Sequence, residues 1–282
     1  MRQRDGAVLC SSCHRLIHVS EKRCPHCGAA APSLFGYGPA LRRVFGPNAD
    51  IVGLIIFVCV LLYAASVGVD LPGMVESSSF GLFDLVSPSM RALTLFGMTG
   101  GWAWAQGHWW TLLTASFLHG SLLHIAFNMM WARQLGSDAV EVFGPARFFV
   151  LWSLSGAGGF LLSNVLGGAP TIGASASVFG LMGGLAAFGR RRGGGIGAQI
   201  SRQMWTWAIA MGIFGALMPA VNNLGHAGGF LSGFLLGYLL PLQGRARETR
   251  VVQVLALVLA VGTAAGVVAS IALNIGPLFL QR

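Results

Sequence analysis

The chain has 282 residues, of which 54% are hydrophobic and only 10% are charged, and its formal net charge is +9. A soluble domain of this length carries about 25% charged residues, so the composition excludes an ordinary soluble protein and indicates a chain in a lipid bilayer. Nucleic acid is a poor explanation for the positive charge, because the basic residues lie between apolar runs, where they act as topology signals.

Four cysteines near the start of the chain form a pattern typical of a zinc site. Cys10-Ser-Ser-Cys13 and Cys24-Pro-His-Cys27 are two CxxC pairs separated by ten residues. Each pair turns two thiolates toward one metal, and two pairs complete the tetrahedral shell of a structural zinc ion. We therefore predict a zinc ribbon over residues 1–36, followed by a linker over residues 37–50, with four ligands: Cys10, Cys13, Cys24 and Cys27.

Two other interpretations apply to these cysteines. Two disulfides would use the same residues, but no secretory signal precedes them, so we expect a cytoplasmic N-terminus where thiols stay reduced. His14, His18 and His26 are substitute ligands, although four thiolates already fill the shell and leave the histidines on the surface. A filled shell has no position for water or substrate, so we expect the ribbon to contact a partner or to regulate.

Residues 51–282 contain seven apolar stretches, most of them near the roughly 20 residues that a spanning helix needs. They lie at 51–69, 111–134, 147–166, 174–189, 203–220, 224–241 and 251–273. Arginines precede the first stretch and follow the fourth and the sixth, and the positive-inside rule places these connections in the cytoplasm. We therefore predict an all-α polytopic membrane domain over residues 51–282, with the N-terminus in the cytoplasm and the C-terminus outside.

The first outer loop, between residues 70 and 110, is long and ends in aromatic side chains. It contains four tryptophans, the composition of an aromatic belt at the level of the lipid headgroups: Trp102, Trp104, Trp109 and Trp110. We expect the loop to lie partly in the outer leaflet, either as a simple anchor or beside the path that a substrate takes.

Polar side chains inside a membrane span are costly, so they are the first candidates for function. The sequence has few of them: His119, His124 and Asn128 in the second stretch, Ser175 and Ser177 in the fourth, and Asn222, Asn223 and His226 in the sixth. His124 and Asn128 are four residues apart and share one helix face. Ser175 begins the fourth helix, where unpaired N–H groups and the helix dipole stabilise an oxyanion. Because the spans alternate in direction, these groups all fall toward the outer side, and one shared site is predicted.

Glycines, of which the chain has 41, predict that the helices carrying Ser175 and His226 pack closely. They form two ridges of small residues spaced by four: Gly180 and Gly184 on one helix, and Gly229, Gly233 and Gly237 on the other. His226 projects from the glycine face, so its ring can reach the hydroxyl of Ser175. Taken singly, a membrane serine is more often a packing residue, and a histidine a satisfied interhelical donor. These two spans contain no Asp or Glu, so the pair would act as a dyad without an acidic third member.

Three segments resemble the rhomboid family in order, spacing and span position. They are Phe117-Leu118-His119 through His124-Ile125-Ala126-Phe127-Asn128, then Gly173-Ala174-Ser175-Ala176-Ser177-Val178-Phe179-Gly180, then His226-Ala227-Gly228-Gly229-Phe230. The resemblance covers about residues 50–275 and implies a bundle of six core transmembrane helices plus one C-terminal helix. It also implies an intramembrane serine endopeptidase that cleaves membrane-anchored proteins in or near their transmembrane segments. We expect such a multi-pass protein in a bacterial cytoplasmic membrane.

The resemblance implies a role for each polar residue. Ser175 would be the nucleophile, His226 the base, and Phe179 the aromatic side chain that packs against the histidine. His124 and Asn128 would form the oxyanion hole with the backbone N–H of Ser175. No cofactor is implied for catalysis, and the sequence has neither an HExxH zinc motif nor a pair of intramembrane aspartates. The expected partners are transmembrane protein substrates, membrane lipid and a cytoplasmic protein that meets the zinc ribbon, with no nucleic acid.

The chain departs from the family pattern at two places. Ala176 replaces the usual glycine after the nucleophile, and His108-Trp109-Trp110-Thr111 replaces the usual Glu-x-Trp-Arg of the first loop. Ser177 is a poor rival nucleophile, because two positions along a helix turn it about 200° away from Ser175.

The alternative function is a catalytically inactive rhomboid-like protein that binds membrane clients. A complete set of dyad and oxyanion residues favours the enzyme. A transporter is disfavoured, because it would place ionisable residues along a path through the bilayer, whereas the polar groups here fall on the outer side only.

Overall fold

The structure, a computed structural model, describes residues 3–10, 15–26, 28, 32–33, 51–78, 84–218, 221–242 and 248–280. The chain divides into two compact units, residues 1–54 and residues 55–282. The first unit contains a small sheet, and the second is built from helices alone in its described part.

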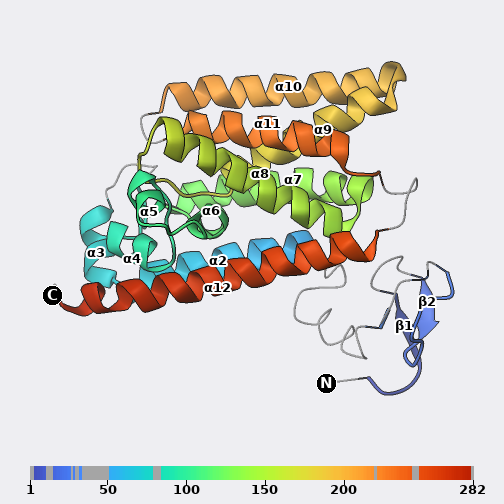
Figure 1. Cartoon of the computed structure of the whole chain (residues 1–282), viewed down its shortest axis with the longest axis horizontal. Helices are drawn as coiled ribbons and strands as arrows, with labels where there is room; N and C mark the ends of the chain where they lie inside the picture. The colour runs from blue at the N-terminus through green and yellow to red at the C-terminus, as the bar shows by residue number, and fades with distance from the viewer. Residues whose placement is uncertain are drawn as a thin grey trace. The chain divides into compact units, whose positions relative to one another are not determined.

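The N-terminal unit is organised around a two-stranded antiparallel sheet of β1 (Ala7–Leu9) and β2 (Leu16–His18) (Figure 1). Val8 lies opposite Ile17, and both are buried while their neighbours along each strand are exposed, as the two-residue period of a strand requires. Cys10 and Cys24 are buried in the same cluster as these two side chains and Val19. Two of the four predicted zinc ligands therefore lie in one apolar core, while Cys13 and Cys27 lie outside the described residues.

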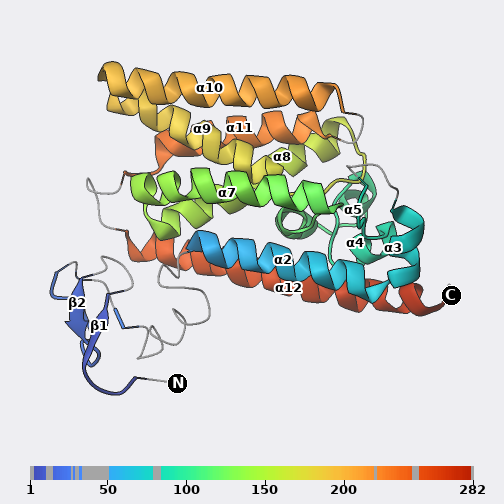
Figure 2. The same cartoon turned by 180° about the vertical axis from the view of Figure 1, so that it is seen from behind.

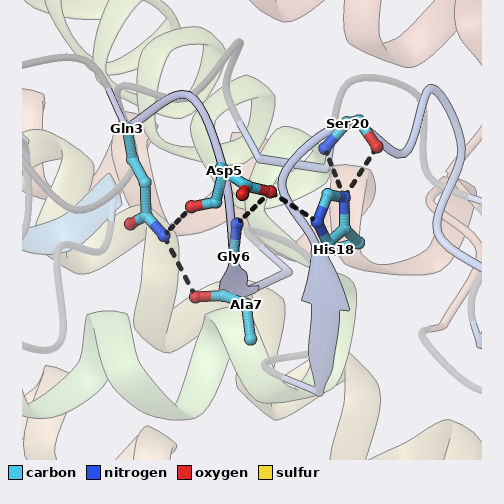
Figure 3. A network of polar contacts seen from close by, with 6 residues as sticks. All are labelled: Gln3, Asp5, Gly6, Ala7, His18 and Ser20. Carbon is cyan, nitrogen blue, oxygen red and sulfur yellow. Dashed lines mark hydrogen bonds and ion pairs between the residues drawn. The ribbon is translucent and has the colours of Figure 1, made fainter.

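A polar network on the surface of this unit engages His18 (Figure 3). Its Nε2 lies 3.1 Å from Oδ1 of Asp5, and its Nδ1 lies 2.7 Å from Oγ of Ser20. His18 and His26 are exposed, as the sequence predicts, whereas His14 lies outside the described residues. Both ring nitrogens of His18 thus have polar neighbours close by in the same unit, as expected for a surface histidine.

Seven long helices lie within the described part of residues 51–280, and the boundary between the two units falls after Leu54, inside the first of them. They are α2 (Ile51–Val69), α7 (Leu122–Phe143), α8 (Pro145–Leu166), α9 (Ser175–Arg192), α10 (Gly194–Ala216), α11 (Asn223–Leu239) and α12 (Arg250–Leu280). Short helices connect α2 to α7: α3 (Leu71–Ser77), α4 (Met90–Leu95), α5 (Gly101–Ala105), α6 (Thr111–Thr114) and the 3-10 turn η2 (Ala115–Phe117). Figures 1 and 2 show α10 on one side of the bundle, α2 and α12 on the other, and α9 enclosed between them.

Three of the described helices are long and apolar enough to cross a membrane: 51–69, 145–166 and 250–276. The segments Thr111–Phe117 and Leu122–Phe143 make a fourth candidate if they are counted as one span, although they meet at 95°. The remaining long helices are more polar or shorter, since α9 ends in three arginines and α11 has 17 residues. These helices support a multi-pass membrane protein, and the full count of seven spans stays a prediction.

The helix predicted over residues 111–134 is wrong, because residues 118–121 interrupt it. The hydroxyl of Ser121 accepts a hydrogen bond from the backbone N–H of His124 at 3.2 Å, so a new helix begins at Leu122. His119 consequently lies in the break and not on the helix that carries His124. The helix predicted to begin at residue 203 begins at Gly194 instead, which places Arg202 inside α10 rather than in a connecting loop.

The close packing predicted from the glycine ridges is confirmed. A Cβ added at Gly229 would overlap the carbonyl oxygen of Ala176, and one at Gly233 would overlap the carbonyl oxygen of Gly180. The third glycine, Gly237, packs in the same way against Gly184. Helices α9 and α11 therefore touch backbone to backbone along their length, and any side chain on this ridge would force them apart.

Candidate active site

Ser175 and His226 meet at one end of this glycine-packed pair. Ser175 is the first residue of α9, and His226 lies in the first turn of α11. Oγ of the serine lies 2.9 Å from Nε2 of the histidine, within hydrogen-bond distance. The sequence placed both residues at helix starts on facing helices, and the structure brings them together.

The imidazole of His226 is held by an aromatic ring. The ring of Phe179, one turn after Ser175, stacks on it with a centroid distance of 4.2 Å and an angle of 8° between the planes. Nδ1 of His226 is buried, and within the described part of the chain it meets no hydrogen-bond partner. The ring is therefore oriented by packing and by the bond to Ser175, with no carboxylate behind it.

Asn222 fixes the start of α11 relative to its neighbours. Its Oδ1 caps the helix by accepting from the backbone N–H of Gly225 at 2.9 Å. Its Nδ2 donates to the hydroxyl of Ser163 on α8 and to the hydroxyl of Thr171, which lies 3.0 Å away in the segment leading to Ser175. The Asn222 amide thus connects the helix of His226 to helix α8 and to the segment that precedes Ser175.

A second set of polar contacts joins the segment between α4 and α6 to the segment that precedes Ser175. Thr99 and Thr171 exchange two backbone hydrogen bonds, of 3.3 and 2.8 Å. The hydroxyl of Thr99 accepts from Nδ2 of Asn164 at 2.9 Å and from the hydroxyl of Thr111 at 3.0 Å. No motif in the sequence predicts these contacts. Asn164 could have been recognised as a candidate from the sequence, because it is an amide inside the third apolar stretch and polar groups in a span are costly.

His124 faces the space beside Ser175. Its Nδ1 accepts a hydrogen bond from the backbone N–H of Gly120 at 3.2 Å, so a neutral ring carries its proton on Nε2. A Cβ built on Gly173 would lie 2.7 Å from this Nε2 and 3.7 Å from Oγ of Ser175. Both polar atoms therefore border one small volume, which stays open because residue 173 is glycine with a φ of +122°.

Asn128 and His119 both contact His124. Asn128 is one turn along α7 from His124, and its Nδ2 donates to the carbonyl oxygen of His124 at 2.8 Å. His119 is fully buried, and its ring meets that of His124 edge to face at a centroid distance of 5.2 Å. Neither residue has a described contact with Ser175.

The two residues that follow Ser175 face the protein interior. Ser177 is fully buried, and its hydroxyl lies 3.4 Å from that of Ser116, on the side away from Ser175. Ala176 is buried in a cluster with Ala115 and Phe160, and its methyl group faces Gly159 of α8. The alanine that departs from the family pattern thus adds its methyl group to the helix packing and leaves the serine hydroxyl unobstructed.

The segment that contains this site is similar to a known protein family. Residues 106–243 match the Rhomboid domain. That range includes Ser175, His226 and the other candidate site residues of the membrane unit. The match supports the rhomboid family for this segment of the chain.

Three relatives illustrate the range of the similarity. Rhomboid protease GluP of Bacillus subtilis (strain 168) is 32% identical over 187 residues, which are 62% of this chain and 35% of that protein. Rhomboid-like protease 3 of Toxoplasma gondii is 31% identical over 150 residues, 52% of this chain and 57% of that protein. Inactive RHOMBOID-like protein 8 of Arabidopsis thaliana is 26% identical over 198 residues, 64% of this chain and 56% of that protein. The matched segment thus spans only about a third to three fifths of each relative, and these relatives include both proteases and a protein named inactive.

Proposed function

We propose that this protein is a rhomboid-type intramembrane serine endopeptidase that cleaves membrane-anchored proteins in or near their transmembrane segments with a dyad of Ser175 and His226. The observation that carries the proposal is the 2.9 Å distance between Oγ of the serine and Nε2 of the histidine. A serine hydroxyl becomes a useful nucleophile only when an adjacent base can remove its proton. The protease names of two relatives point in the same direction.

The proposed reaction follows from the two atoms in contact. Nε2 of His226 accepts the proton from Ser175 while Oγ attacks the scissile carbonyl carbon, and the imidazolium then donates that proton to the leaving amine. A water molecule next attacks the acyl-enzyme, with His226 again accepting and returning the proton. Phe179 keeps the ring plane fixed through both steps, which replaces the orienting acid of a triad.

An oxyanion hole beside Ser175 would stabilise the tetrahedral intermediate. The backbone N–H groups at the start of α9 and the Nε2–H of His124 border the volume next to the serine hydroxyl. We assign Asn128 as a further donor, because its amide has a second N–H beyond the one given to the carbonyl of His124.

The second candidate function is a catalytically inactive rhomboid-like protein that binds membrane clients. The name of one Arabidopsis thaliana relative motivates it. An inactive protein has no need of a serine and a histidine at hydrogen-bond distance with a stacked aromatic ring, which favours the enzyme.

Labelling by a fluorophosphonate separates the two functions. We expect the purified full-length protein to be labelled at Ser175, and Ser175→Ala and His226→Ala each to abolish labelling. Ser177→Ala is the matched control and should be labelled like the wild type, because its hydroxyl faces Ser116. Labelling that survives both dyad substitutions, or that disappears in the Ser177 variant alone, would reject the dyad.

The N-terminal unit is proposed to hold one structural zinc on Cys10, Cys13, Cys24 and Cys27. The burial of Cys10 and Cys24 in one cluster supports this, since thiolates that share a metal must converge. A structural zinc would supply folding energy to a sheet of only two short strands. Its proposed partner is a cytoplasmic protein, in keeping with a cytoplasmic N-terminus and an external C-terminus in a bacterial cytoplasmic membrane.

A further inference from the structure

An open surface cavity of about 490 Å³ lies at the end of α9 opposite to Ser175, where α9 turns into α10. It is lined by residues of these two helices and the turn between them: Gly189, Arg190, Gly193, Gly194, Ala198, Ser201, Arg202 and Trp205. Ser175 is the first residue of α9, and Arg190 lies 15 residues later in its last turn. About 22 Å of helix therefore separates the cavity from Ser175. The cavity is therefore distinct from the proposed catalytic centre.

Two arginines give this cavity its charge. Arg190 and Arg202 line it, no lining residue is acidic, and no ion pair joins either guanidinium to a carboxylate in the described part of the chain. The neighbouring Arg191 behaves differently, because it donates to the carbonyl oxygens of Gly237 and Leu240 at 2.6 and 2.7 Å. Arg191 thus caps the end of α11, whereas Arg190 and Arg202 have no carboxylate partner among the described residues.

The guanidinium of Arg190 is held in place by an aromatic ring. It lies over the ring of Phe234 on α11, 5.4 Å from the ring centre, a cation–π contact that orients it without using its N–H donors. Trp205 forms the wall on the side of α10 and packs against Phe230, with ring centroids 4.5 Å apart. Arginines beside a tryptophan are the composition expected at the level of lipid headgroups.

The turn between α9 and α10 also lines the cavity. Gly193 alone separates α9 from α10, and it and Gly194 have φ values of +69° and +67° that favour glycine. No side chain caps the first turn of α10, so its backbone N–H groups add donors to those of the arginines. These donors supplement the two guanidinium groups, which carry the recognition.

We propose that this cavity binds the phosphodiester headgroup of an anionic membrane lipid. Guanidinium groups recognise phosphate oxygens through paired, charge-assisted hydrogen bonds. Arginines at this end of the bundle face the cytoplasm under the positive-inside rule, and the cytoplasmic leaflet carries the anionic lipids that basic pockets between helices bind. The proposal is independent of catalysis, since it uses no residue of the dyad.

The test compares lipid binding to the full-length protein and its variants by native mass spectrometry from detergent, with phosphatidylglycerol and phosphatidylcholine titrated separately. We expect the wild type to bind phosphatidylglycerol more tightly than phosphatidylcholine. Arg190→Gln combined with Arg202→Gln should weaken phosphatidylglycerol binding roughly tenfold or more, because each arginine near a membrane surface contributes about 1 kcal/mol. The corresponding double substitution to lysine keeps the charge but loses the paired guanidinium hydrogen bonds, so it should bind phosphatidylglycerol more weakly than the wild type and more tightly than the double glutamine variant.

Arg250→Gln provides the matched control, because this arginine is exposed at the start of α12 and does not line the cavity. It should bind phosphatidylglycerol like the wild type. Equal binding by the wild type and the double glutamine variant would overturn the proposal, as would an equal loss in Arg250→Gln, which would indicate surface charge alone. Added inorganic phosphate should fail to displace the lipid, and displacement by phosphate at matched concentration would show a free-phosphate site and reject the headgroup assignment.

Discussion

The orientation of the His226 imidazole depends on two neighbouring side chains. Phe179 stacks on the ring and fixes its plane. Asn222 fixes the position of α11, which carries His226, by donating hydrogen bonds to Ser163 and Thr171. Because a dyad has no acid to orient the base, a small displacement of α11 would separate Nε2 from the serine hydroxyl. Asn222 is therefore best described as a positioning residue.

Replacement of Asn222 tests this role. Asn222→Ser keeps a good helix cap but is too short to reach Ser163 and Thr171, whereas Asn222→Ala loses both the cap and the tether. Loss of a cap costs about 1 kcal/mol, so we expect the alanine variant to unfold at lower temperature than the serine variant. Both variants should lose fluorophosphonate labelling rate to a similar extent. A serine variant that is labelled as fast as the wild type would show that the asparagine only caps the helix.

At the scale of secondary structure, the position of the dyad depends on contact between the backbones of α9 and α11. Gly233→Ala places a methyl group against the carbonyl oxygen of Gly180, and overpacking of this kind typically costs about 1–3 kcal/mol. We expect a lower unfolding temperature in detergent and slower labelling of Ser175. Gly212→Ala on α10 is the matched control, because a Cβ there meets nothing within 4 Å. Equal stability of the two variants would show that the glycine ridge is not a tight contact.

The sequence predicted most of these helices, because long apolar runs and glycine spacing are local signals. It missed the break at residues 118–121, although His119-Gly120-Ser121 interrupts the apolar run of residues 111–134, because a short polar interruption is tolerated inside a long apolar helix and Ser121 is recognised as a cap only in the structure. It also missed the contacts among Thr99, Asn164 and Thr171, because they join residues far apart in the chain. Single polar residues in apolar runs indicated which positions matter for function, but only the structure shows which residues they contact.

At the scale of the whole molecule, the two units are expected to have separable roles. A tetrahedral shell of four thiolates leaves no open position at the metal, so a zinc ion there cannot polarise a scissile carbonyl. The proposed topology places the N-terminus in the cytoplasm and Ser175 toward the outer side, across about 30 Å of bilayer. The zinc ribbon would therefore act on partners, abundance or substrate choice rather than on chemistry.

Removal of residues 1–36 tests this separation. We expect the truncated protein to contain no zinc by elemental analysis, yet to cleave a model transmembrane substrate in detergent at a rate close to that of the full chain. Cys10→Ser with Cys24→Ser should also lose zinc, whereas Cys59→Ser, which changes the buried cysteine of α2, should keep it. A well-folded truncated protein without activity, restored by zinc-loaded ribbon added separately, would show that the ribbon controls the catalytic core directly. Such a result would require a physical path from the ribbon to the dyad, because the metal itself has no free coordination position to offer a substrate.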